Sequence, residues 1–374
     1  MSKSAIVIGA GIAGLATARA LAIRGYKVTV LERTEKAVGA SIRNFGMIWP
    51  IGQPSGALYH RALLSKSIWK GVCTSAAIWF EEAGSLHAAY DPLEQKVLEE
   101  FYETAKAERP LRLLNANESV SKSAAIKQQG LHLSLYSSDE MIVDPREAIR
   151  KIPGYLHEKY GVEFHWSSGV TALHHPTVCC GNKVYEADRI FICNGADFET
   201  LFPEQFAQLP LTKCKLQMMR TEAQPANWRL GSALCGGLSL IHYKSFAAAP
   251  SLSALAQKFQ MELPEYLQWG IHVMTAQNES GEITIGDSHE YGQTFEPFDK
   301  ALINDLILSY LQKFCSLKSS RIIETWNGIY PKLKNGGTEI VLQPQNGVTI
   351  INGLGGAGMS LSFGLAEEVI GKSG

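Results

Sequence analysis

The sequence predicts a two-domain α/β fold, in which a discontinuous Rossmann-like domain is joined to a domain built on an antiparallel sheet. Three observations predict it. The chain opens with an apolar strand, a glycine turn and a helix. The strand candidates within residues 211–287 alternate between apolar and polar side chains, as in an antiparallel sheet with one exposed face. The chain closes with a second glycine turn that opens a helix. Its 374 residues are enough for two domains.

The opening segment has the arrangement of a dinucleotide-binding unit. Gly9 allows a tight turn out of the strand, Gly11 lets the backbone approach a pyrophosphate, and Gly14 lets the helix pack closely on the sheet. The helix N-terminus then offers unpaired N–H groups to the phosphates. Strand, turn, helix, second strand and terminal acid follow in the expected order, at residues 4–8, 9–14, 15–24, 27–31 and Glu32.

Glu32 is placed to accept hydrogen bonds from a ribose. An acid at this position argues against NADP, because it would repel the 2′-phosphate. FAD and NAD both remain possible on this ground.

The rest of the chain divides into further elements by periodicity, caps and breakers. Residues 44–54 are apolar but carry two glycines and two prolines, so we expect an irregular segment that lines a buried ligand. Asp144 followed by Pro145 predicts a helix start. We expect helices over 55–83, 92–107, 145–160, 251–269 (a pair), 297–314 and 359–370, and extended segments over 131–143, 161–164, 169–173, 183–187, 189–193, 212–221, 233–246, 271–277, 282–286, 321–330 and 347–352.

The glycines at residues 353–358 also fit a dinucleotide fingerprint, but a second site needs an acid about twenty residues further on. The chain ends at Gly374, so we expect this turn to return to the first domain and direct a helix N-terminus at the same cofactor. A flavin gains from that arrangement, because its reduction places negative charge on the ring edge. FAD is therefore favoured over NAD.

Composition excludes several classes. The net charge of −1 gives no electrostatic case for nucleic acid or an anionic membrane, and no apolar run is long enough to span a bilayer. The seven cysteines form no ligand-spaced cluster, so we expect reduced thiols, no metal site and a cytoplasmic location. The first strand is expected from residue 4, so we expect no signal peptide. The oligomeric state is left open.

The order of motifs resembles the D-amino-acid oxidase and glycine oxidase family of FAD-dependent amine oxidases. The resemblance rests on the opening unit, Asn194-Gly195-Ala196, the segment 326–331 (WNGIYP) and the closing helix. More narrowly, segments 43–53, 286–291 and 355–359 are similar to a bacterial subgroup associated with aminophosphonate breakdown.

The resemblance implies non-covalent FAD, since no cysteine fits the covalent attachment motif of related sarcosine oxidases. It implies an FAD-binding domain over residues 1–85, 140–210 and 320–374, and a substrate-binding domain over 86–139 and 211–319. The expected cofactor-binding residues are Gly9, Gly11, Ile12, Ala13, Gly14, Glu32, Arg33, Ser41, Asn44, Gly46, Met47, Val170, Asn194, Gly195, Gly328, Gly355, Gly356, Ala357, Gly358 and Met359.

The chain departs from that family at Tyr330, where oxidases of amino acids carry an Arg that clamps the substrate carboxylate. Without this Arg a simple α-amino acid fits poorly, and an amine with a more distant anion fits better. Lys332, His289, His272 and Arg61 are the candidates for holding a phosphonate dianion, and Trp49, Tyr243 and Tyr330 are the candidates for the pocket wall.

The expected function is oxidation of a primary or secondary amine to an imine by hydride transfer to flavin N5, with 2-aminoethylphosphonate or its N-methyl derivative as substrate. Oxygen or another acceptor would take the electrons, so a dehydrogenase is an alternative. A glycine- or sarcosine-type oxidase is a second alternative, and a flavin-binding subunit without turnover is a third. No catalytic dyad is expected, because the flavin carries the chemistry.

Overall fold

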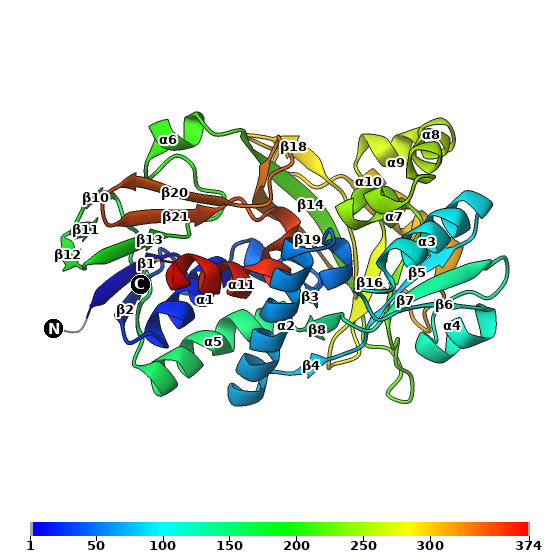
Figure 1. The fold of residues 1–374 in the computed structure, drawn as a ribbon, viewed down its shortest axis with the longest axis horizontal. Coiled ribbons are helices and arrows are strands. Elements are labelled where there is room, and N and C mark those ends of the chain that lie inside the picture. The colour runs from blue at the N-terminus through cyan, green and yellow to red at the C-terminus, as the bar shows by residue number, and fades with distance from the viewer. Residues whose placement is uncertain (1–2, 373–374) are drawn as a thin grey trace.

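The structure is a computed structural model that describes residues 3–372, and two sheets lie side by side in it (Figure 1). The first has six strands in the order β20-β21-β13-β1-β2-β9, and its pairs are parallel except for the edge strand β20. This is the expected Rossmann-like sheet. Its strands are β1 (Ser4–Ile8), β2 (Lys27–Leu31), β9 (Glu163–His165), β13 (Arg189–Ile192), β20 (Ile340–Gln345) and β21 (Val348–Asn352).

Side chains of β1 are buried on both faces of this sheet, which explains its continuous apolar run. Ala5 and Val7 belong to the core beneath the helices, whereas Ile6 and Ile8 belong to the opposite core. A small antiparallel sheet lies in the same half: β10 (Ala172–His174), β11 (Thr177–Cys180) and β12 (Lys183–Glu186). The helices of this half are α1 (Ile12–Ala22), α2 (Ala57–Ser75), α5 (Pro145–Tyr160), α6 (Pro203–Ala207) and α11 (Gly358–Gly371).

Helix α5 begins where the sequence predicts. The Asp144 side chain accepts hydrogen bonds from the N–H groups of Arg146 and Glu147, and Pro145 fills the first helical position. Pro153 lies inside the helix, which nevertheless runs as one element to Tyr160. The final helix, α11, contacts both α1 and α2 (Figure 1), so the C-terminal segment returns to the first domain.

The second sheet has the order β18-β14-β17-β16-β15-β5-β7-β6, with β19 also paired to β14. All its pairs are antiparallel except β15 with β5. The strands are β5 (Ser85–Ala89), β6 (Leu111–Leu114), β7 (Leu133–Ser137), β14 (Leu211–Thr221), β15 (Ala233–Cys235), β16 (Met274–Gln277), β17 (Ile283–Gly286), β18 (Glu290–Gly292) and β19 (Ile322–Leu333). The helices are α3 (Pro92–Ala105), α4 (Ala116–Lys122), α7 (Leu238–His242), α8 (Leu252–Glu262), α9 (Pro264–Gln268) and α10 (Ala301–Phe314).

Shorter pieces join the two halves. A three-stranded sheet pairs β3 (Met47–Ile48) and β4 (Phe80–Glu81) with β8 (Met141–Val143). The 3₁₀ helices are η1 (Ala40–Ile42), η2 (Pro50–Gly52), η3 (Lys244–Ala248) and η4 (Gly355–Ala357).

Three expectations differ from the structure. The strand expected over 233–246 stops at Cys235, because Gly236 and Gly237 pack against bulky side chains and the chain then turns into α7 and η3. The helix expected over 55–83 ends at Ser75, before Ala77 with its positive φ of 49°. The expected domain boundary at residue 320 separates β19 from β14, yet these two strands are paired over their lengths.

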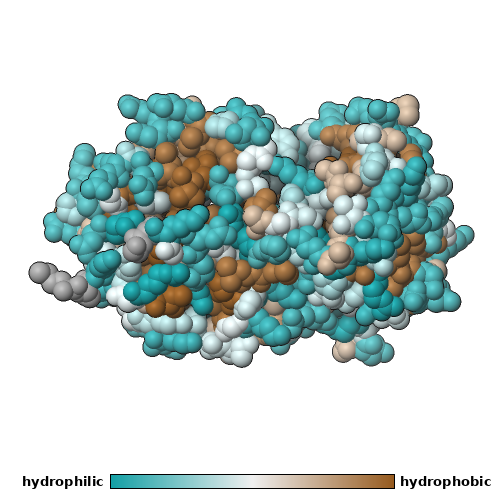
Figure 2. Space-filling view, in the orientation of Figure 1, coloured by the Kyte–Doolittle hydropathy of each residue, from teal (hydrophilic) through white to brown (hydrophobic). Residues whose placement is uncertain are grey.

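The surface in the view of Figure 2 is mainly hydrophilic, with separate apolar patches. Among the described residues, no helix combines the length and the apolar character that crossing a membrane requires.

Candidate functional site

A cavity of about 1450 Å³ runs between the two sheets. One end is lined by the turn after β1 and by the end of β2, and the other by residues of β14, β19 and α7. Its volume exceeds the usual range of roughly 300–1,000 Å³ for a single small-ligand site. The cavity therefore has room for a dinucleotide and a small substrate together.

The dinucleotide end is formed by the glycine turn as the sequence predicts. Gly9 has a φ of +103°, and a Cβ on it would lie 2.4 Å from the carbonyl oxygen of Cys193. Gly11 lines the cavity at the N-terminus of α1, where no side chain of the capping residue satisfies the helix. The Ser41 hydroxyl accepts a hydrogen bond from Ile12 N at 2.9 Å. These backbone groups form a cradle that only glycines leave open to a phosphate.

Glu32 is buried at the carboxyl end of β2 and lines the cavity. Its Oε2 accepts a hydrogen bond from Ala10 N at 2.9 Å, and its Oε1 accepts from Thr34 N at 3.1 Å and from Thr34 Oγ1 at 2.8 Å. These bonds fix the carboxylate at the position where a ribose hydroxyl of a bound dinucleotide would reach it.

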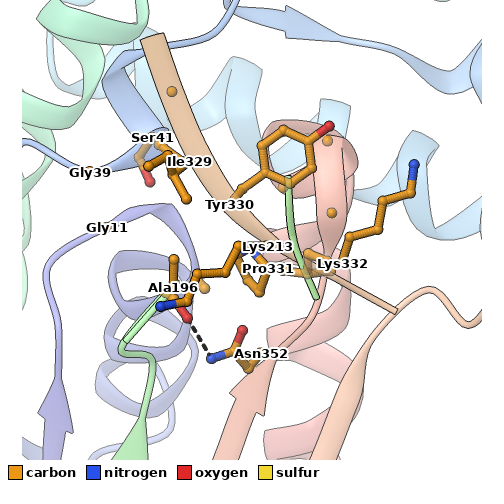
Figure 3. A pocket seen from close by; sticks show the side chains of 18 of the residues that line it. Gly11, Gly39, Ser41, Ala196, Lys213, Ile329, Tyr330, Pro331, Lys332 and Asn352 are labelled. Atoms are coloured by element: carbon orange, nitrogen blue, oxygen red, sulfur yellow. Dashed lines mark hydrogen bonds between the residues drawn. The ribbon is translucent and has the colours of Figure 1, made fainter. Parts of the chain in front are cut away.

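The other cofactor elements meet at the carboxyl ends of β13 and β21. Asn352 Nδ2 donates to Asn194 Oδ1 and to the Gly195 carbonyl oxygen, both at 2.9 Å, and this corner lies at the cavity in Figure 3. The turn at Gly355–Ala357 brings the N-terminus of α11 to the same cavity, with no capping side chain. An uncapped helix N-terminus suits the negative charge that a flavin gains on reduction. The residues present thus fit FAD.

Most expected cofactor residues line the cavity, and two do not. Gly14 is buried beneath it, where a Cβ would lie 1.8 Å from the carbonyl oxygen of Gly9. Gly46 has a φ of +75° and packs against the carbonyl of Val143, so it serves the turn rather than the cofactor. The cavity lining includes Gly9, Gly11, Ile12, Ala13, Glu32, Arg33, Ser41, Asn44, Met47, Val170, Asn194, Gly195, Gly328, Gly355, Gly356, Ala357, Gly358 and Met359.

The irregular segment 44–54 lines the cavity where Trp49 meets Tyr243, with ring centroids 6.4 Å apart. Buried hydrogen bonds hold the segment in place. Trp49 N donates to Ser360 Oγ at 2.8 Å, and Ile51 N donates to Glu140 Oε1 at 3.0 Å. The carboxyl group of Glu140 also accepts a hydrogen bond from Ser85 Oγ.

Burial raises the pKa of Glu140 to about 7. A carboxyl group with a raised folded-state pKa stabilises the fold fully below its unfolded pKa, and this contribution is lost as the pH rises through 7. Between pH 5 and pH 8, the melting temperature measured by calorimetry should therefore fall less for Glu140→Gln than for the wild type. Burial also raises the pKa of Glu94 to about 7, so part of the slope should persist. Equal slopes of melting temperature against pH in the wild type and in Glu140→Gln would contradict the raised pKa of Glu140.

Strand β19 carries Tyr330 and Lys332 to the cavity, and because they are two residues apart they share one face of the strand (Figure 3). Tyr330 is 6% exposed. Lys332 Nζ donates a hydrogen bond to the hydroxyl of Tyr291 at 3.1 Å and lies 5.1 Å from the centre of its ring. Tyr330 thus shares its face of β19 with Lys332.

Three histidines and one aspartate lie at the same end of the cavity. The rings of His242 and His272 stack with centroids 3.7 Å apart, and His289 is stacked on His272 at 5.2 Å. Asp287 Oδ1 lies 3.0 Å from His272 Nε2, and Asp287 Oδ2 lies 3.8 Å from His289 Nε2. We call His242, His272, His289 and Asp287 the histidine cluster.

Arg61, expected as a substrate residue, does not line the cavity. Its guanidinium binds both carboxylate oxygens of Glu368 at 2.9 and 2.7 Å, and its Nη1 lies 2.8 Å from Glu339 Oε1. This expectation is wrong, because Arg61 joins α2 to α11 and to Glu339, the residue before β20, rather than facing a ligand. Nothing adjacent in the sequence indicates these distant partners.

The Arg61→Met variant should lose about 2 kcal/mol of stability, since it leaves two partly buried carboxylates without their cation. Thermal unfolding should show a fall in the melting temperature of a few degrees, with the KM for the amine substrate unchanged. Arg150→Met on the exposed face of α5 is the matched control and should not change either quantity. A raised KM with an unchanged melting temperature would show that Arg61 takes part in substrate binding.

Sequence reasoning missed two members of the histidine cluster. His242 falls in the segment expected as a strand, and the observed helix α7 directs it to the cavity instead. Asp287 lies in the segment 286–291 together with His289, so its proximity to a candidate cation was the available signal. Trp49, Tyr243, His272, His289, Tyr330 and Lys332 all line the cavity as expected.

The fold and the site together define a flavin-dependent oxidoreductase. Residues 4–371 match the model of the family described as FAD dependent oxidoreductase (DAO), and the chain belongs to this family. It is therefore an FAD-dependent oxidoreductase.

Among curated proteins, the chain is similar to the tRNA 5-methylaminomethyl-2-thiouridine biosynthesis bifunctional protein MnmC of Stutzerimonas stutzeri (strain A1501), with 28% identity over 250 residues that cover 62% of this chain and 35% of the relative. The chain thus matches about a third of that protein's length. Glycine oxidase from Geobacillus kaustophilus has a similar fold, with a TM-score of 0.77, 16% identity and coverage of 99% of this chain and 94% of that chain. L-proline dehydrogenase from P. horikoshii gives a TM-score of 0.77 at 19% identity, covering 100% and 94%.

Proposed function

We propose that this oxidoreductase acts on 2-aminoethylphosphonate or its N-methyl derivative. The observation that carries the proposal is the substitution of the family's carboxylate-binding Arg by Tyr330, together with Lys332 and the histidine cluster in the same cavity. An α-carboxylate finds no bidentate partner at Tyr330. A phosphonate, which lies two carbons from the amine, would reach the lysine and the imidazoles.

The proposed roles of the residues follow from their chemistry. Lys332, His272 and His289 hold the phosphonate, and the rings of Trp49 and Tyr330, with Tyr243, wall the substrate and exclude water. Bound FAD supplies the oxidising power, because it accepts the hydride of the carbon beside the amine.

The substrate must enter as the neutral amine, whose nitrogen lone pair becomes part of the imine double bond as the hydride leaves. The remaining N–H proton is given up to form the neutral imine. Water then hydrolyses the imine to phosphonoacetaldehyde and to ammonia or methylamine. Oxygen would return the cofactor to its oxidised state and form hydrogen peroxide. None of these steps needs a dedicated acid–base dyad.

The similarity to MnmC favours secondary-amine chemistry in particular. The name of that protein refers to a methylaminomethyl group, which is a secondary amine. N-methyl-2-aminoethylphosphonate carries the same CH₂–NH–CH₃ unit. The net charge of −1 argues against a tRNA partner for this chain. All seven cysteines are free thiols, which suits a reducing cytoplasm.

Anaerobic stopped-flow measurement of flavin bleaching tests the proposal. 2-Aminoethylphosphonate, its N-methyl form, glycine and sarcosine are compared at equal concentration. Fast bleaching by the phosphonates alone supports it. Preference for glycine or sarcosine would mean that another cation replaces the missing Arg, and absence of bleaching by every amine would favour a non-catalytic flavin subunit. Oxygen uptake by the reduced enzyme then separates an oxidase from a dehydrogenase with another acceptor.

A further inference from the structure

We infer that the histidine cluster takes up protons when a tetrahedral dianion binds, so that the cavity selects doubly charged oxyanions over singly charged ones. This inference rests on the proposed phosphonate substrate and concerns the same end of the cavity. It assigns a role to His242, which no sequence motif indicates.

The hydrogen-bond pattern shows how few protons the cluster can offer while its rings are neutral. His289 Nδ1 lies 2.9 Å from the carbonyl oxygen of Gly270, which can only accept, so Nδ1 carries the hydrogen and Nε2 has a lone pair. His272 Nε2 faces the Asp287 carboxylate at 3.0 Å, which leaves its buried Nδ1 without a partner. Among the residues that the structure describes, the His242 ring has stacking partners but no hydrogen-bond partner.

Burial disfavours charge on two of these rings, those of His289 and His242. It lowers the pKa of His289 to about 4, against a smaller opposing effect of Asp287. It lowers the pKa of His242 well below its ordinary value, and the neighbouring His272, His289 and Lys332 act in the same direction. His242 and His289 thus carry few protons at neutral pH, and their ring nitrogens offer lone pairs.

The charges that face this end of the cavity are few. Asp287 contributes one negative charge and Lys332 one positive charge, so they cancel when the rings are neutral. The buried His87 also interacts with His272, and burial lowers the pKa of His87 to about 3, so it adds no charge. Tyr291, Tyr330 and Tyr243 surround them with hydroxyl groups, and burial raises the pKa of each tyrosine. The positive charge of Lys332 acts on His242 and His289, which favours an anion over a metal cation here.

A dianion in this place would leave two uncompensated negative charges in a buried site, which is strongly unfavourable. Protons taken up by the imidazoles remove that cost and create N–H donors where lone pairs stood. Each pair of protonated ring and oxyanion then forms a charge-assisted hydrogen bond. A monoanion needs one proton fewer, so it gains less from the cluster.

The pH dependence of binding measures this uptake without turnover. Sulfate and methanesulfonate are tetrahedral sulfur oxyanions of charge −2 and −1 that do not titrate near neutral pH, so any proton taken up belongs to the protein. Their dissociation constants are measured on the FAD-loaded enzyme from the shift of the visible flavin spectrum. The pH runs from 6 to 8 in Bis-Tris and Tris, which carry no oxyanion. For sulfate we expect Kd to rise about tenfold or more per pH unit, and for methanesulfonate a clearly smaller slope.

A tenfold rise of Kd per pH unit is a slope of one in log Kd against pH. The variants His289→Asn and His242→Asn should each reduce this slope for sulfate by a large part of one. His174→Asn, on exposed strand β10 outside the cavity, is the matched control and should keep the full slope. A sulfate slope near zero, a slope equal to that of methanesulfonate, or failure of both anions to bind would overturn the inference. If 2-aminoethylphosphonate still bleaches the flavin, the proposed function survives that result. A steep sulfate slope without bleaching would instead keep the dianion site and reject the substrate.

Discussion

Replacing Lys332 by methionine should raise the KM for 2-aminoethylphosphonate about 100-fold, because loss of a charge-assisted contact to a buried anion costs about 3 kcal/mol. Methionine keeps the length and the apolar stem of the lysine, so β19 should fold as before. The limiting rate of anaerobic flavin bleaching should change much less, since Lys332 contacts the anion and not the carbon that is oxidised. Stopped-flow titration with the substrate separates the two quantities.

Lys334→Met provides the control on the same segment. Lys334 is exposed and does not line the cavity, so its removal changes the charge of the protein equally without touching the site. An equal rise of KM in both variants would show a general charge effect and would remove Lys332 from the site. An unchanged KM in both would contradict the phosphonate proposal directly.

Replacing Gly14 by alanine should abolish retention of FAD. The added Cβ would lie 1.8 Å from the carbonyl oxygen of Gly9 and 3.5 Å from Val7 Cγ1. Backbone atoms cannot yield as a flexible side chain can, so α1 must move away from the turn that forms the phosphate cradle. We expect visible flavin absorbance per protein to fall at least tenfold after gel filtration, with a lowered melting temperature.

The matched control is Gly71→Ala in helix α2, where an added Cβ meets no atom within 4 Å. Alanine is the better helix former, so this variant should keep its FAD and gain up to about 1 kcal/mol of stability. Full flavin content in Gly14→Ala would show that the turn tolerates the methyl group and that its geometry does not set cofactor affinity.

The Rossmann-like half was predictable because its signals are local. Strand β1, the glycine turn, α1 and Glu32 follow one another closely in the chain. Each residue type meets one structural requirement of a dinucleotide site. The expected return of α11 to this half is confirmed by its contacts with α1 and α2. The FAD assignment is confirmed by the family match.

The substrate half was less predictable because its order depends on distant partners. Alternation over 233–246 resembled a strand, but packing of Gly236 and Gly237 against Tyr310, Phe314 and Glu94 turns the chain into a helix. Arg61 was misplaced for the same reason, since its partner Glu368 lies in the last helix. His272 was proposed from its residue type, and His289 also from its place beside a motif of the family, whereas the stacking with His242 required the fold.

The ladder between β14 and β19 extends in unbroken antiparallel register from Leu211↔Leu333 to Arg220↔Glu324. It holds the cavity-lining residues Gly328, expected at the cofactor, and Lys332, proposed for the anion, on one stretch of hydrogen-bonded backbone, which a bridge from Lys332 to Leu354 ties to the closing turn. A paired strand cannot lengthen or shorten. The strand therefore fixes the distance between Gly328 and Lys332. A substrate fits only if the distance between its anion and its amine matches this fixed length.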